Sequence, residues 1–103
     1  MSRTYTAVFH DVWVAMLAAA GALRGWTVTA ADSRAGTATI ATADLLGRSP
    51  AVAEVRLSLD PLGLTLLEVH LPATERPEPA RDARRARRLL RRVDRLLAGA
   101  PRR

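Results

Sequence analysis

The feature that most constrains the fold of this chain is an uncharged run of twelve residues near its start, Val12 to Leu23. Apolar side chains recur in the run at helical spacing, so we expect an α-helix from Val12 to Arg24. Asp11 is its expected N-cap, and Gly25 is a residue type that ends helices in the left-handed conformation. The run is too short to span a bilayer, so we expect a helix buried in a folded domain. Its core-facing stripe is predicted to be Val12, Trp13, Met16, Leu17, Ala20 and Leu23.

The opposite side of this helix also lacks charge, and a helix that is apolar all round is normally covered on both sides. We expect one side to lie on a β-sheet. The alanine-rich side predicts either a second helix at close approach or another copy of the protein. Our leading hypothesis is therefore a non-enzymatic protein-interaction module that self-associates. The candidate interface comprises Val14, Ala15, Ala18, Ala19 and Ala22.

Alternating apolar and polar residues predict strands on either side of this helix. Residues 3–9 fit a first strand, and residues 26–31 and 37–42 fit a β-hairpin around the polar turn 32–36. The hairpin and the helix together indicate a domain that mixes both kinds of secondary structure.

Two further strands are predicted around residues 60–63, whose proline and glycine suit a tight turn. The strand before the turn alternates through Val55 and Leu57 to Leu59. The strand after it spans residues 64–71, and its apolar phase changes along its length. This change predicts a bulge or a strand that is buried on both faces.

Two segments are expected to connect these elements. The loop 43–50 contains Leu45 and Leu46, which either close the end of the core or form a binding lip at the sheet edge. Residues 72–79 hold three prolines and are typical of an extended linker. A last helix is expected from 80 to 98, with an apolar stripe on one side and arginine on the other.

The expected order is thus strand, helix, four strands, helix. This order predicts an α+β fold, in which an antiparallel sheet carries two helices packed on one face. A chain of 103 residues has the size of one ordinary domain. We expect residues 1–71 to supply the sheet and first helix, 72–79 the linker and 80–98 the arginine-rich helix of a single domain, 1–103.

The net charge of +6 is concentrated at the carboxyl end, where residues 76–103 hold eleven arginines and three acids. Every basic residue is arginine, which a GC-rich coding bias also produces. Like charges at helical spacing repel each other, and a polyanion relieves that repulsion. Our alternative hypothesis is therefore binding of nucleic acid or another polyanion by the last helix. Its candidate contacts are Arg84, Arg85, Arg88, Arg91, Arg92 and Arg95.

Catalytic motifs are missing from the sequence, and we expect no enzyme, no cofactor and no metal. The absence of cysteine excludes disulfides and thiolate sites and fits a cytoplasmic protein. The residues with acid-base potential are His10, Asp11, Glu68 and His70. A third hypothesis is a small ligand-binding or cyclase-like enzyme. This hypothesis requires a cavity between sheet and helix that His70 or His10 reaches.

Residues 12–59 carry a recognisable pattern: Val12, Trp13, Ala15 and Leu17 on the helix, then Gly25-Trp26, then the segment Thr39 to Thr42. The pattern resembles small bacterial domains of unknown function, many in envelope proteins, and more loosely the helix-grip domains of the lipoprotein BamC. That resemblance implies a sheet gripping a long helix and a role in binding rather than catalysis.

Overall fold

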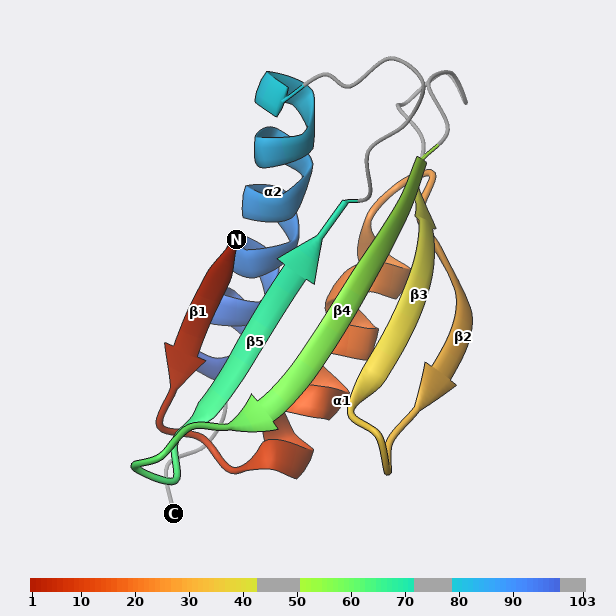
Figure 1. The fold of residues 1–103 in the computed structure, drawn as a ribbon. Helices are drawn as coiled ribbons and strands as arrows, with labels where there is room; N and C mark the ends of the chain where they lie inside the picture. The colour runs from red at the N-terminus through yellow and green to blue at the C-terminus, as the bar shows by residue number, and fades with distance from the viewer. Residues whose placement is uncertain (43–50, 72–78, 99–103) are drawn as a thin grey trace.

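The computed structural model describes residues 1–42, 51–71 and 79–98. The strands are β1 (Ser2–Tyr5), β2 (Thr27–Asp32), β3 (Thr37–Thr42), β4 (Ala51–Leu59) and β5 (Thr65–His70), and the helices are α1 (Phe9–Ala22) and α2 (Pro79–Ala98). All strand pairs are antiparallel, in the order β1-β5-β4-β3-β2. Both helices lie on the same side of this sheet (Figure 1). The predicted α+β fold and its β-α-β-β-β-β-α order are confirmed.

The two predicted turns are held by aspartates. In the β2–β3 turn, Asp32 accepts hydrogen bonds from the backbone N–H groups of Arg34 and Ala35. Gly36 follows with φ of 69°, a conformation that favours glycine. In the β4–β5 turn, Asp60 plays the same part for two backbone N–H groups. Each hairpin register is therefore fixed locally, as the sequence predicts.

Strand β1 pairs with a strand that is distant from it in the sequence. It pairs with β5 from Ser2 opposite Glu68 to Tyr5 opposite Thr65. The Thr65 hydroxyl then donates to the carbonyl oxygen of Ala7 at 2.9 Å. This bond fixes the connection that leads from β1 into α1.

One hydrophobic core lies between the sheet and the helix layer. Inward-facing side chains alternate along β3, β4 and β5, as period-two spacing requires. Thr42 and Thr65 are buried with them, each with its hydroxyl donating to a backbone carbonyl. The largest fully buried apolar side chains are Met16, Ile40, Leu67, Leu89, Leu90, Val12, Val55 and Val93.

Helix α1 starts earlier than the sequence predicts, at Phe9, and its N-cap is Val8, which makes no side-chain capping bond. Asp11 lies in the first turn instead of capping it, and β1 ends at Tyr5 rather than at residue 9. Phe9 stacks on Trp13 one turn later, with ring centroids 6.4 Å apart. Phe9 thus belongs to the helix, where its ring meets that of Trp13, although the alternation of residues 3–9 predicted that it ends a strand.

The predicted irregularity of the fifth strand is wrong. The β4–β5 register runs without a shift from Glu54 opposite His70 to Leu59 opposite Thr65. Leu64 belongs to the turn, where its carbonyl oxygen accepts from the N–H of Asp60. Leu66 lies within β5 on the outer face and is partly buried, so the apolar phase changes without a break in the register. The register shift of this sheet lies in β2, between Val28 and Ala30.

The loop 43–50, with Leu45 and Leu46, and linker residues 72–78 lie outside the described residues. Residue 79, predicted as the end of the linker, is the first residue of α2. Among the described parts of the chain, neither helix has the length and apolar character needed to cross a membrane.

Candidate functional site

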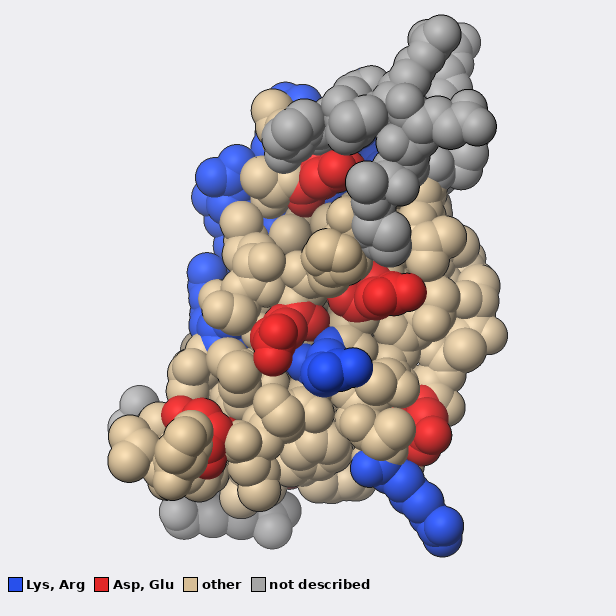
Figure 2. Space-filling model, viewed as in Figure 1, with Lys and Arg blue, Asp and Glu red and all other residues tan. Residues whose placement is uncertain are grey.

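The strongest charged surface of the molecule is the outer side of α2. Packing decides which residues form it, because Ala86, Leu89, Leu90 and Val93 are buried against the core. The opposite side of the helix is therefore turned to solvent, and Figure 2 shows its basic side chains along one margin of the molecule. We call this surface the arginine face. Its members, all exposed, are Arg84, Arg87, Arg88, Arg91, Arg92 and Arg95.

This set differs from the predicted one by two residues. Arg85 is only 8% exposed, and its Nη1 donates to the hydroxyl oxygen of Thr42 at 3.5 Å. It precedes Leu89 by one turn, so it lies at the buried border of the helix and is not available to a polyanion. Arg87 was missed, although it precedes Arg91 by four residues, which is the spacing that identifies a shared face.

The positive charge of the arginine face is uncompensated. Within residues 1–42, 51–71 and 79–98, none of its six guanidinium groups makes an ion pair or a hydrogen bond to another group. Asp94, on the same helix, is engaged elsewhere: it forms an ion pair with Arg3 and accepts a hydrogen bond from the Tyr5 hydroxyl at 2.6 Å. Four pairs of like charge at i, i+4 therefore face solvent together.

The predicted interface on α1 is divided by the fold. Ala15 and Ala19 are buried within the chain. The buried side of α1 faces both the sheet and α2, and α1 contacts both of them. This corrects the predicted interface, because neither residue reaches a partner. Val14 is 50% exposed, and Ala18 and Ala22 are exposed with it. We expected either a second helix or another copy of the protein to cover the alanine-rich side. The second helix, α2, contacts α1, while the part that carries Val14, Ala18 and Ala22 stays exposed.

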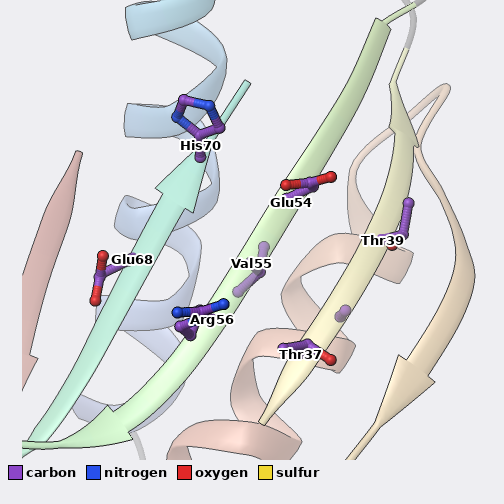
Figure 3. Close-up of a pocket in the computed structure, with 8 residues that line it drawn as sticks. Thr37, Thr39, Glu54, Val55, Arg56, Glu68 and His70 are labelled. Carbon is purple, nitrogen blue, oxygen red and sulfur yellow. The ribbon is translucent and has the colours of Figure 1, made fainter. Parts of the chain in front are cut away.

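A hollow of about 420 Å³ lies on the outer face of the sheet, the side without helices. Glu54 is paired across strands with His70, and Arg56 with Glu68, so acidic and basic groups alternate over it (Figure 3). Threonines of β3 complete its border. The pattern is that of a solvated sheet face with mixed charge.

The fold does not assemble the four residues with acid-base potential. Glu68 and His70 lie on the outer sheet face, whereas His10 and Asp11 lie in the first turn of α1 on the other layer. Both histidines are exposed, so neither reaches the space between sheet and helices that the enzyme reading requires. In the parts of the chain that the structure describes, there is also no group of three or more His, Cys, Asp or Glu suited to a metal ion.

Comparison with known protein families and with curated proteins gives no match to this chain. The resemblance of residues 12–59 to helix-grip domains of envelope proteins therefore stays a prediction.

Proposed function

We propose that this protein is a non-enzymatic binding module that holds a polyanion on the arginine face of α2. The observation that carries the proposal is the state of the six arginines: they are exposed on one face, and none has an internal partner among the residues that the structure describes. The fold does not use them for packing, since the buried side of the helix is aliphatic.

Physical chemistry favours an anionic partner here. Arginines one turn apart repel each other by a few tenths of a kcal/mol for each pair. A polyanion removes this repulsion and releases its own counterions, which makes association strongly dependent on salt. Guanidinium groups also form bidentate bonds with phosphate, so phosphate-bearing polymers and surfaces are the chemistry that suits this face.

A titration with labelled polyanions tests the proposal. Wild-type protein should bind a fluorescent 20-base-pair duplex in 50 mM salt. If about four phosphates are contacted, affinity should fall roughly a hundredfold between 50 and 200 mM salt. The double variant Arg88→Gln, Arg92→Gln should weaken binding at least tenfold.

A matched control separates the face from net charge. The double variant Arg34→Gln, Arg56→Gln removes the same two charges from the β2–β3 turn and the sheet. It should bind almost as wild type does. Equal losses in the two double variants, or no binding at 50 mM salt by wild type, would refute the proposal.

Self-association through α1 is a second candidate, because Val14, Ala18 and Ala22 leave an uncharged helix surface open. Small side chains of this kind allow another helix to approach closely. Sedimentation equilibrium should then show a dimer at high micromolar concentration. Ala18→Glu should convert it to a monomer, whereas Thr4→Glu, on the outer face of β1, should not. A monomer at all concentrations removes this candidate and leaves polyanion binding untouched.

A further inference from the structure

A cluster of exposed apolar side chains lies at one end of the molecule. Leu62 is 84% exposed in the β4–β5 turn, Leu59 is 62% exposed at the end of β4, and Val8 is 64% exposed at the entry to α1. These three residues form what we call the apolar tip. Thr65 pairs with Leu59 and bonds to the carbonyl of Ala7, so both segments lie at the same end of the sheet. Leucine and valine exposed together in this way mark an interaction surface.

The turn that carries Leu62 is rigidly held. Asp60 accepts the N–H groups of Leu62 and Leu64, each at 2.9 Å, and its own N–H donates to the carbonyl of Leu64. Gly63 adopts φ of 80°, which completes the reversal. The backbone that presents Leu62 is thus fixed before any partner arrives, which lowers the entropic cost of binding.

The arginine face ends beside the apolar tip. Tyr5 of β1 pairs with Thr65 and hydrogen bonds to Asp94, in the last turns of α2. The contact places the carboxyl end of α2 at the same end of the molecule as the β4–β5 turn (Figure 1). Arg91, Arg92 and Arg95 belong to these last turns. One end of the protein therefore presents apolar and cationic side chains together.

From this juxtaposition we propose that the protein docks on an anionic lipid bilayer, with the apolar tip inserted among the acyl chains and the arginine face against lipid phosphates. The inference rests on the proposed function and names its partner. A bilayer surface offers both phosphate charge and an apolar layer directly beneath it, which is the combination this end presents. Nucleic acids accept aliphatic side chains only at a few places, such as thymine methyl groups or between unstacked base steps, and the tip lacks the aromatic rings that stack on bases.

Acidic residues near this end do not oppose the docking strongly. The carboxylates of Asp32 and Asp60 are each directed to backbone N–H groups of their own turns. Asp94 is neutralised by Arg3. Asp11 lies in the first turn of α1, close to Val8, and adds a third acidic group. The remaining charges at this end are then four arginines against three aspartates, namely Arg34, Arg91, Arg92 and Arg95 against Asp11, Asp32 and Asp60.

Vesicle co-sedimentation tests the inference. Wild type should bind vesicles of phosphatidylcholine with phosphatidylglycerol, and only weakly vesicles of phosphatidylcholine alone. Leu62→Ser should lose about tenfold or more in affinity for the anionic vesicles, the value of one partly inserted leucine. Val52→Ser is the matched control, because Val52 is an exposed aliphatic residue at the opposite end of β4. It should bind as wild type does, and near-UV circular dichroism should show both variants folded.

The same variants titrated with duplex DNA separate the two proposals. Leu62→Ser should leave any DNA affinity unchanged. Anionic vesicle binding that is insensitive to Leu62→Ser, or equal binding to neutral vesicles, overturns membrane insertion. Tight binding to DNA without binding to anionic vesicles overturns it as well, and leaves polyanion binding by α2 standing. Failure to bind either probe overturns both.

Discussion

The two helices cover the same face of one sheet, yet their sequences and their roles differ sharply. From Val12 to Ala22, α1 carries no charge, while α2 has an arginine in almost every turn. Composition alone assigns α1 to the interior and α2 to the surface. The structure leaves Val14 and Ala18 of α1 exposed and buries Arg85 of α2. Burial is therefore set by the position of a residue around the helix relative to its neighbours, and only partly by its own polarity.

The contacts that hold the helices in place also differ. Helix α1 is held by close packing, with Ala19, Ala20 and Met16 fully buried. Helix α2 combines an aliphatic stripe with polar bonds to both ends of the sheet, through Asp94 to β1 and through Arg85 to Thr42. We therefore expect the packing of α1 to be sensitive to changes in side-chain volume, and the packing of α2 to the loss of particular hydrogen-bonding partners.

The largest expected effect comes from a charge on the packed side of α1. Ala19→Asp places an unpaired carboxylate in the core and should lower the free energy of unfolding by about 3–5 kcal/mol. Ala18→Asp, one position along and exposed, should change it by about 0.5 kcal/mol or less. Urea denaturation followed by tryptophan fluorescence measures both. Similar losses in the two variants would show that α1 is covered on every side.

A smaller loss is expected where α2 is bonded to β1. Asp94→Ala removes the acceptor for Tyr5 and Arg3 and should cost about 1–2 kcal/mol, mostly through Tyr5, since the Arg3 pair is open to solvent. Asp11→Ala, in the first turn of α1, should cost about 0.5 kcal/mol at most. Thermal denaturation of both variants compares the two helices directly. An equal effect would remove the distinction between packing and specific bonds.

The same junction predicts a pH dependence. Burial, reinforced by the hydrogen bond to Asp94, raises the pKa of Tyr5 above its ordinary value. The folded state therefore keeps the phenolic proton that the unfolded state loses above pH of about 10, so stability falls as pH rises from there. The slope should approach about 1.4 kcal/mol per pH unit where the unfolded tyrosine is ionised and the folded one is not. Solvent screening of this half-buried group narrows the pH range over which that slope holds.

The chain holds one tyrosine, so the rise in absorbance near 295 nm with increasing pH reports the ionisation of this group alone. Titration of the folded protein should lag behind titration in 8 M urea. Tyr5→Phe should remove the alkaline loss of stability that wild type shows. Coincident titration curves for the folded and unfolded protein would disprove a protected tyrosine.

The smallest effect concerns the arginine face. Arg91→Gln removes repulsion with Arg87 and Arg95 and should raise stability by a few tenths of a kcal/mol at low salt. In 1 M salt the difference from wild type should vanish, because charges at this spacing are screened. Differential scanning calorimetry at the two salt concentrations detects the change. A destabilised variant would indicate that the arginines support the fold itself.

The sequence predicts most of the fold because its strongest signals are local. Asp32, Gly36 and Asp60 specify their turns through short-range bonds, and residues 37–42 alternate as the observed strand does. The start of α1 was not predicted because Phe9 fits two patterns. It continues the period-two alternation of a strand, and it also lies four residues before Trp13, on which it stacks in the helix.

The candidate surfaces were harder to predict, since they depend on long-range contacts. Nothing local shows that Arg85 reaches Thr42, forty-three residues earlier, while Arg87 faces solvent. The burial of Ala15 and Ala19 likewise depends on a helix sixty residues further along the chain. The apolar tip requires the β4–β5 turn to meet the entry to α1, about fifty residues earlier, which no single stretch of sequence displays.

The pairing of β1 with β5 affects how this protein folds during its synthesis on the ribosome. Ser2 to Tyr5 are translated before α1, yet their partner strand β5 is translated about sixty residues later, and Asp94 later still. Until then the apolar segment that becomes α1 lacks the cover that α2 supplies. The sheet and helix layer can close only after β5 and α2 have been synthesised, and until then the nascent chain exposes apolar surface that chaperones bind.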